Sequence, residues 1–159
     1  MEKDFIKIKP CKKIETFDAD KNSNGWVLEL VSDKDKFTKH IKGQLYLTVA
    51  APGSFKGFHI HALADYFITC ITGEITDIVY YNKDTKREIK AGDGNFKTVF
   101  VPKGCPHGIK NAGNKPAYVL IYRYPAWDPN IKEQLDIDPE EIETKKSWLK
   151  IKKFIEQFK

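Results

Sequence analysis

Three of the four histidines of this chain lie in two short motifs. His59 and His61 belong to the sequence Lys-Gly-Phe-His-Ile-His, and His107 follows a Pro-Lys-Gly-Cys-Pro turn. Residues two apart in a β-strand point to the same side, so a strand would place both imidazoles of the first motif on one face. A neutral imidazole binds divalent metals, and an imidazole with a pKa near neutrality acts as a base. Metal binding and proton transfer are therefore both open for these residues.

The elements that would position these motifs follow from a β-rich pattern between residues 26 and 124. Short runs rich in Val, Ile, Thr, Tyr and Phe are closed by Gly, Pro, Asn or Asp, at intervals of about 8 to 12 residues. This spacing is typical of a sandwich, a barrel or a jelly roll, and it predicts an all-β fold. The expected strands span residues 26–31, 44–51, 54–61, 65–72, 74–81, 96–101 and 117–124.

A helix is expected after the β region, over residues 139–158. Asp138 resembles an N-cap, Pro139 suits the first helical position, and two glutamates follow where they favour the helix dipole. The segment also carries an apolar stripe at helical spacing, which must be covered by the β domain or by a partner subunit. The stripe consists of Trp148, Ile151, Phe154, Ile155 and Phe158.

Length and charge narrow the class of protein. A chain of 159 residues predicts one domain over residues 1–159. Residues 144–159 contain six lysines and one glutamate, so this segment alone accounts for the net charge of +5. A lysine excess on one terminal helix is typical of a solvated face, so we expect no nucleic-acid partner.

Cysteine content and hydropathy point to the cytoplasm. The three cysteines, Cys11, Cys70 and Cys105, form no CxxC pair, which argues against a disulfide framework and against a zinc-ribbon site. No apolar stretch is long enough to span a membrane, and the N-terminus lacks the apolar core of a signal peptide. We therefore expect a cytoplasmic protein with no membrane partner.

The two histidine motifs resemble the two motifs of the cupin superfamily, whose fold is a β jelly roll. The first resemblance is His59 and His61 with Gly73 after the next strand, and the second is Pro-x-Gly-x-x-His-x-x-x-Asn over residues 102–111. Cupins usually carry a glutamate ligand seven residues before that glycine, where this chain has Tyr66. The resemblance implies a cupin jelly roll with a C-terminal helix, and the tyrosine weakens the case for a four-ligand metal site.

A longer stretch, residues 43–140, resembles the dTDP-4-dehydrorhamnose 3,5-epimerase group of nucleotide-sugar enzymes. The matching pieces are Pro-Gly at 52–53, Lys-Gly-Phe-His at 56–59, Gly-Glu at 73–74, the Pro-Lys-Gly-Cys-Pro-His-Gly-Ile run at 102–109, and Trp-Asp-Pro at 127–129. Those epimerases need no metal and use a histidine base and a tyrosine acid on opposite sides of a 4-keto sugar. The resemblance implies a nucleotide-sugar substrate and a homodimer.

Carried over residue by residue, the resemblance assigns roles within the site. It implies that His59 is the base and Tyr122 the acid, although Tyr118 and Tyr124 share the strand parity of Tyr122. The substrate contacts that it implies are Lys56 near the nucleotide phosphates, His107 lining the pocket, and Tyr66 at the place of a substrate-facing lysine.

Two differences from the epimerases leave the reaction open. The pair His59 and His61 is similar to the cupin 3,4-ketoisomerases, in which both histidines transfer protons, so His61 is a second catalytic candidate. The epimerases also have an aspartate near the C-terminus that orients the base, and residues 144–159 contain no counterpart. The prediction is therefore a metal-free isomerase, an epimerase or a ketoisomerase, which acts on a nucleotide-linked 4-keto-6-deoxy sugar in carbohydrate biosynthesis.

Two alternatives come from other classes of function. In the first, His59, His61 and His107 bind a divalent metal such as Fe, Mn or Zn in a dioxygenase or a sugar-phosphate isomerase. In the second, the chain is a non-catalytic cupin that binds a sugar, which the missing orienting aspartate favours.

Overall fold

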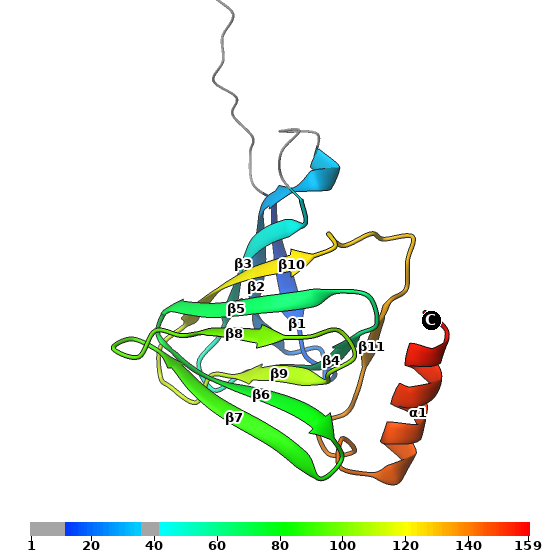
Figure 1. Cartoon of the computed structure of the whole chain (residues 1–159). Coiled ribbons are helices and arrows are strands. Elements are labelled where there is room, and N and C mark those ends of the chain that lie inside the picture. The colour runs from blue at the N-terminus through cyan, green and yellow to red at the C-terminus, as the bar shows by residue number, and fades with distance from the viewer. Residues whose placement is uncertain (1–11, 36–41) are drawn as a thin grey trace, which may run out of the picture.

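Two antiparallel sheets face one another in the computed structural model, which describes residues 12–35 and 42–159 (Figure 1). The six-stranded sheet has the order β1-β2-β3-β10-β5-β8, and the five-stranded sheet has the order β11-β4-β9-β6-β7. Their strands are β1 (Lys12–Phe17), β2 (Ser23–Ser32), β3 (Gln44–Ala50), β4 (Phe55–His61), β5 (Asp65–Thr72), β6 (Glu74–Asn82), β7 (Thr85–Gly92), β8 (Thr98–Val101), β9 (His107–Lys110), β10 (Ala117–Tyr124) and β11 (Gln134–Asp136). A short 3-10 helix, η1 (Asp33–Asp35), follows β2, and α1 (Lys145–Glu156) ends the chain.

The all-β prediction is confirmed, and each of the seven expected strands has a counterpart. Four strands, β1, β7, β9 and β11, were not predicted. Strand β7 is charged and mostly exposed, so it lacks the alternation of apolar and polar residues that reveals a half-buried strand. Strand β11 has only three residues, which is too short for any periodicity. The missed strands matter for function because β9 and β11 lie on either side of β4 in the five-stranded sheet.

The C-terminal helix is present but starts later than expected, at Lys145. The Asp138 carboxylate accepts the N–H of Glu140 at 2.8 Å within a turn and does not cap the helix. The N-cap is Thr144, whose hydroxyl accepts the N–H of Ser147 at 3.2 Å. A local side-chain bond at Asp138 thus competes with helix formation and delays it.

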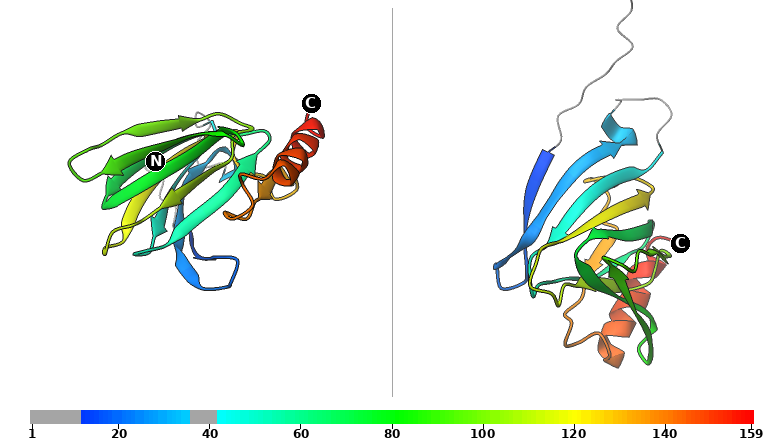
Figure 2. Two further views of the ribbon diagram at one scale, coloured as in Figure 1. Left: turned by 90° about the horizontal axis from the view of Figure 1, so that it is seen from below. Right: turned by 90° about the vertical axis from the view of Figure 1, so that its left-hand side faces the viewer.

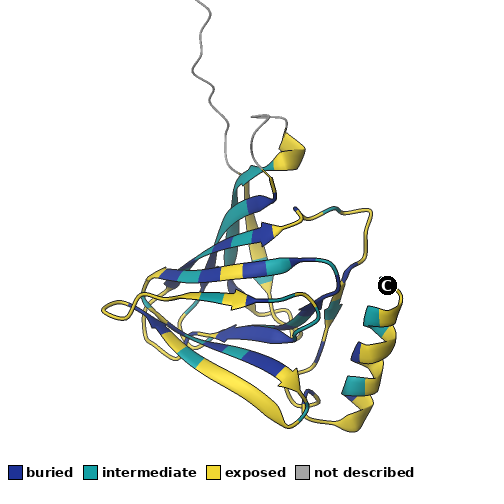
Figure 3. Cartoon of the chain, viewed as in Figure 1, coloured by how far each residue is buried: buried dark blue, intermediate teal, exposed yellow. Residues whose placement is uncertain are grey.

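Helix α1 lies beside the five-stranded sheet (Figures 1 and 2), and its apolar stripe packs on the outer face of that sheet. Ile151 is 2% exposed against Phe58 and Ile60 of β4, whose side chains point away from the histidines of the same strand. The lysine-rich face of α1 is exposed, as Figure 3 shows. The β domain therefore supplies the cover that the stripe requires. No helix in residues 12–35 or 42–159 is long and apolar enough to cross a membrane.

Between the sheets, one cluster of buried side chains forms the main core. Its members include Ile68, Cys70, Val79 and Val119, each no more than 4% exposed. Asp77 on β6 is also fully buried, and neither of its carboxyl oxygens has a hydrogen-bond partner among the described residues. Burial raises the pKa of Asp77 to about 7 because a low-dielectric core disfavours the charged form.

We expect Asp77→Val to stabilise the protein. The native state holds a proton on Asp77 that the unfolded chain releases, so wild-type stability should fall between about pH 4 and pH 7. Above pH 7 the variant should gain on the order of 2 kcal/mol, with a smaller gain at pH 5. Urea unfolding of both proteins at the two pH values measures this difference. Equal stability at pH 8 would contradict the account.

Exposed aromatic side chains lie on the outer face of the six-stranded sheet. Phe67 and Phe100 have ring centroids 5.0 Å apart and are 39% and 53% exposed. Cys70 and Cys105 are free thiols, and Cys11 lies outside the described residues. The homodimer expected from the sequence stays a prediction.

Candidate active site

A cavity of about 1250 Å³ lies between the inner faces of the two sheets. The five-stranded sheet contributes His59, His61 and His107, and the six-stranded sheet contributes Tyr46 and Tyr66. The cavity thus brings three predicted histidines together with one predicted tyrosine.

One row of side chains crosses three neighbouring strands of the five-stranded sheet. Asp136 of β11 pairs with His59 of β4, and His59 pairs with His107 of β9. Directly opposite residues in antiparallel strands share a face, so all three point into the cavity. Gly57 allows β4 and β9 to approach closely: a Cβ at this position, with φ of +123°, would lie 2.7 Å from the Cα of Gly108.

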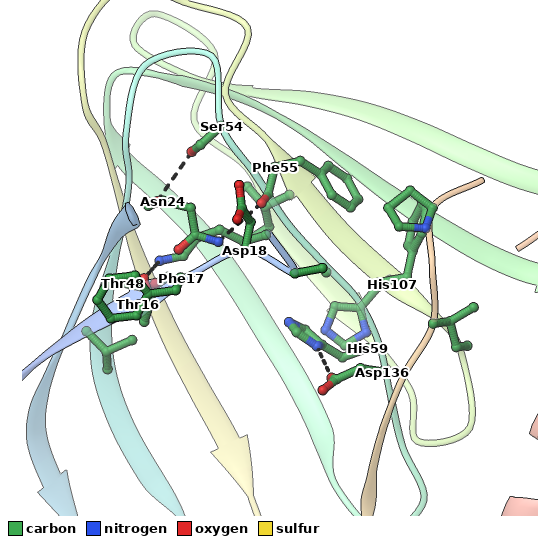
Figure 4. A pocket seen from close by; sticks show the side chains of 18 of the residues that line it. Thr16, Phe17, Asp18, Asn24, Thr48, Ser54, Phe55, His59, His107 and Asp136 are labelled. Atoms are coloured by element: carbon green, nitrogen blue, oxygen red, sulfur yellow. Dashed lines mark hydrogen bonds and ion pairs between the residues drawn. The ribbon is translucent and has the colours of Figure 1, made fainter. Parts of the chain in front are cut away.

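His59 and Asp136 form a histidine–carboxylate pair on the cavity wall (Figure 4). Nδ1 of His59 lies 2.7 Å from Oδ1 of Asp136, and Gln134 donates to the same oxygen at 2.7 Å. The hydrogen bond from His59 holds the pKa of Asp136 below its ordinary value. An ionised Asp136 accepts a hydrogen bond from the Nδ1–H of His59, which leaves Nε2 of His59 with a free lone pair. This arrangement suits a general base.

Asp136 supplies the orienting acid that sequence reasoning did not find. The acid was expected within residues 144–159, whereas Asp136 precedes the helix and reaches His59 through the pairing of β11 with β4. The sequence does contain two acids three residues apart, Glu133 and Asp136, which could have been matched with the two histidines of the His-x-His motif. The observation that favoured a non-catalytic binding module is therefore removed.

His61 has its own carboxylate partner, Glu133, and both side chains are 5% exposed. Nδ1 of His61 lies 3.1 Å from Oε1 of Glu133, and Arg123 donates to the same oxygen at 2.8 Å. Burial opposes ionisation of Glu133, but the hydrogen bonds and positive charge of its partners outweigh this effect and lower its pKa to about 2. Burial also lowers the pKa of His61, so its imidazole is neutral at neutral pH.

We expect Glu133→Gln to destabilise the fold by about 3 kcal/mol at pH 7, because it leaves the Arg123 charge buried without a counter-ion. The pKa of Glu133 is lower in the folded state, so its contribution is complete above about pH 4.5 and is lost as the pH falls towards 2. Denaturant unfolding of both proteins at pH 7 and pH 3 should show a smaller difference at pH 3. A difference that does not change with pH would contradict this assignment.

His107 is a neutral acceptor in the cavity. Burial and the neighbouring His61 lower its pKa to about 3. Its Nδ1 lies 3.3 Å from the carbonyl of Cys105 and donates to it, so Nε2 is left as an acceptor. This arrangement suits contact with a substrate hydroxyl, the kind of role predicted from the sequence.

Lys56 lines the cavity near the β1–β2 hairpin. Its Nζ donates to the hydroxyl of Thr16 at 2.7 Å and to the carbonyl of Val49 at 3.1 Å. Burial lowers the pKa of Lys56 to about 8. The ammonium therefore retains one hydrogen for an anionic ligand, and its role near phosphates stays a prediction.

Tyr122 does not lie in the cavity. Strand β10 alternates, and its buried residues Ile121 and Arg123 face inward. Tyr122 points outward: its hydroxyl donates to the carbonyl of Lys42 at 2.9 Å, and its ring lies 6.0 Å from that of Phe67. Tyr118 and Tyr124 share this outer face. The sequence shows that Tyr118, Tyr122 and Tyr124 share one face of their strand, but it does not show whether that face points into or out of the core. Because the structure places this face outside, the assignment of Tyr122 as the acid is not supported.

Metal binding by His59, His61 and His107, the alternative from the sequence, stays a prediction. The ring centroid of His61 lies 6.2 Å from that of His59 and 5.7 Å from that of His107. Nδ1 of His59 faces Asp136 and Nδ1 of His107 faces the carbonyl of Cys105, so Nε2 is the nitrogen that each of these two rings leaves for a ligand. Among residues 12–35 and 42–159, no group of three or more His, Cys, Asp or Glu side chains is arranged to hold a metal ion.

Comparison with known proteins places these features in a family. SpsL, a spore coat polysaccharide biosynthesis protein of Bacillus subtilis, is 26% identical over 133 residues, which cover 80% of this chain and 83% of SpsL. Agl13, a probable low-salt glycan biosynthesis epimerase of Haloferax volcanii, is 30% identical over 105 residues, or 61% of this chain and 64% of Agl13.

Solved structures share the fold. The capsular polysaccharide assembling protein CapF of Staphylococcus aureus superposes with a TM-score of 0.66 at 19% identity, over 80% of this chain but only 34% of CapF. NovW, a 4-keto-6-deoxy sugar epimerase of Streptomyces spheroides, superposes with a TM-score of 0.54 at 14% identity, over 82% of this chain and 75% of NovW. Residues 14–134 match the sequence profile of the cupins, and the chain belongs to the cupin family.

Proposed function

We propose that this protein is a sugar epimerase that inverts a carbon next to the ketone of a nucleotide-linked 4-keto-6-deoxy sugar. The observation that carries the proposal is the His59–Asp136 pair on the wall of a large cavity. The names of SpsL, Agl13 and NovW, which refer to polysaccharide, glycan or 4-keto-6-deoxy sugar chemistry, support a role in carbohydrate biosynthesis.

The reaction follows from the acidity that a ketone gives to its neighbours. A carbonyl at C4 acidifies the protons on C3 and C5, so a base near neutral pKa can remove one of them. Nε2 of His59 takes the proton, the C–H electron pair forms the C=C bond of an enolate, and the carbonyl oxygen becomes negative. Asp136 stabilises the imidazolium that results. Return of a proton to the opposite face of the same carbon completes the inversion.

The dimensions and polar groups of the cavity agree with a nucleotide-linked substrate. A volume of about 1250 Å³ exceeds the roughly 300 to 1,000 Å³ of most small-molecule sites, so there is room for more than a monosaccharide. Lys56 can bind a phosphate, and His107 can accept a sugar hydroxyl. The acid–base groups of this proposal are protein side chains, and no step requires a metal.

A 3,4-ketoisomerase is the second candidate, favoured by the position of His59 and His61 on the same face of β4. Both imidazoles could serve one side of the sugar, since a ketoisomerase moves protons on a single face. The two reactions give different products from dTDP-4-keto-6-deoxyglucose, a representative of the proposed class.

Proton NMR of the products distinguishes these reactions. We expect purified protein to convert dTDP-4-keto-6-deoxyglucose into a C3 or C5 epimer that retains the C4 ketone. A product with its ketone at C3 would identify the ketoisomerase instead. Recovery of unchanged sugar, with no hydrogen exchanged at either carbon, would contradict both.

A further inference from the structure

An apolar surface covers the outer face of the six-stranded sheet. Directly opposite residues of antiparallel strands share a face, so the pairing register shows which side chains lie there. One row crosses five strands, from β2 to β8, and consists of Leu28, Leu47, Leu120, Thr69 and Thr98. Leu120 is two residues from the outward-facing Tyr122 on β10, so the whole row points outward.

Aromatic side chains lie on both sides of this row. On one side, the ring centroid of Phe67 lies 5.0 Å from that of Phe100 and 6.0 Å from that of Tyr122. On the other side, the rings of Trp26 and Tyr118 meet edge to face, with centroids 6.1 Å apart. The row and these five rings together form the outer apolar face.

The outer apolar face is large for a surface exposed to water. Phe67 and Phe100 are 39% and 53% exposed, and Tyr124, at the end of β10 on the same side of the sheet, is 49% exposed. Since an aromatic side chain has about 150–250 Å² of surface, these three alone expose about 300 Å². The half-buried leucines and rings of the face bring the apolar area to roughly 600 Å², the upper end for a monomer and close to the ~800 Å² that each partner buries in a standard interface.

No charged side chain interrupts the outer apolar face. At its β1 edge, Lys13 and Glu15 lie 3.6 Å apart and balance one another. The net positive charge of the chain is carried by the lysine-rich α1, which packs against the outer side of the other sheet (Figure 1). Two copies that meet through their six-stranded sheets therefore keep these helices apart, whereas contact through α1 would bring like charges together.

We propose that the outer apolar face binds the same face of a second copy of this chain, so that the protein is a two-fold symmetric dimer of packed six-stranded sheets. Sheets with the same right-handed twist pack face to face with their strands nearly aligned. A second copy supplies a face of the same size and twist, also without charge, and a two-fold axis closes the contact at two chains. The cavity is lined from the inner faces of the sheets, so each copy keeps a complete site.

Sedimentation velocity of the full-length protein at micromolar concentrations tests this interface. We expect twice the mass of one chain for wild type and the mass of one chain for Phe67→Lys. The lysine variant would bury two unpaired ammonium groups per dimer, so its dissociation constant should rise by at least about 10²-fold. Tyr81→Lys is the matched control, because Tyr81 is an aromatic residue of the five-stranded sheet that is 52% exposed, and it should sediment as wild type.

Thr69→Arg is a second variant that leaves every apolar side chain of the face in place. It adds a charge in the central row, next to Leu120, and it should also yield single chains. Far-UV circular dichroism that matches wild type shows that a variant is folded, and if Phe67→Lys is not, Thr69→Arg decides. Wild-type protein that sediments as a single chain, or a dimer that persists in Thr69→Arg, would overturn the proposal. Dissociation by Tyr81→Lys but not by Thr69→Arg would place the contact on the other sheet and would also overturn it.

Discussion

Replacing His59 by glutamine should reduce proton abstraction from dTDP-4-keto-6-deoxyglucose by about 10³- to 10⁴-fold. Nε2 of His59 is the proposed base, and the other ring nitrogen, Nδ1, is oriented by the exposed carboxylate of Asp136. The buried His61 is held by Glu133, and its lowered pKa makes it a weaker base. Loss of His59 therefore removes the first step. Initial rates of deuterium uptake from D₂O, followed by mass spectrometry, measure the effect.

The matched control for this variant is His107→Gln, which alters a neutral acceptor in the same row of the sheet. We expect His107→Gln to raise KM more than it lowers kcat, because His107 contacts the substrate in the ground state as well as in the transition state. Exchange by His59→Gln at a rate close to wild type would show that another group is the base.

Asp136→Asn is expected to lower the rate of the same exchange by about 10³-fold with little effect on the fold. The side chain of Asp136 is 75% exposed, so its loss leaves no buried charge without a partner. An amide can present its N–H to Nδ1, which places the lone pair on that atom and the hydrogen on Nε2. The ring then has the wrong tautomer for a base, and it loses the carboxylate that stabilises the imidazolium.

Two further measurements separate orientation from a structural effect. Asp128→Asn removes a half-buried carboxylate that pairs with Lys34 outside the cavity, and it should leave the exchange rate unchanged. Thermal unfolding should give the same Tm for Asp136→Asn and wild type within a few degrees. If Asp136→Asn exchanges the substrate proton as fast as Asp128→Asn, the His59–Asp136 pair is not the base.

The sequence was sufficient to predict the fold class and the inward histidines because both depend on local patterns. Alternating residues around His59 and His61 place the two imidazoles on one face of a strand whatever its partners are. The helix stripe was also local, and its cover by Phe58 and Ile60 follows from the other face of the same strand.

The partners of the histidines depend on register between distant segments, which local patterns do not reveal. Asp136 reaches His59 through a strand of three residues that pairs across 77 positions of sequence. Glu133, directly before this strand, likewise contacts the distant His61. The charge of Arg123, from the facing sheet, also helps to keep Glu133 ionised. Tyr122 was chosen by residue type and parity, whereas the tyrosines that line the cavity, Tyr46 and Tyr66, lie on other strands.

We propose that His59 removes a proton from a carbon next to the ketone and that protein side chains alone carry out this step. The most direct measurement is deuterium uptake at C3 and C5 of dTDP-4-keto-6-deoxyglucose in D₂O by chelator-treated protein whose metal content has been measured. We expect uptake at one or both carbons at the same rate before and after chelation, and its loss in His59→Gln. No uptake by the wild-type protein, or uptake that is lost on chelation and restored by a divalent metal, would contradict it.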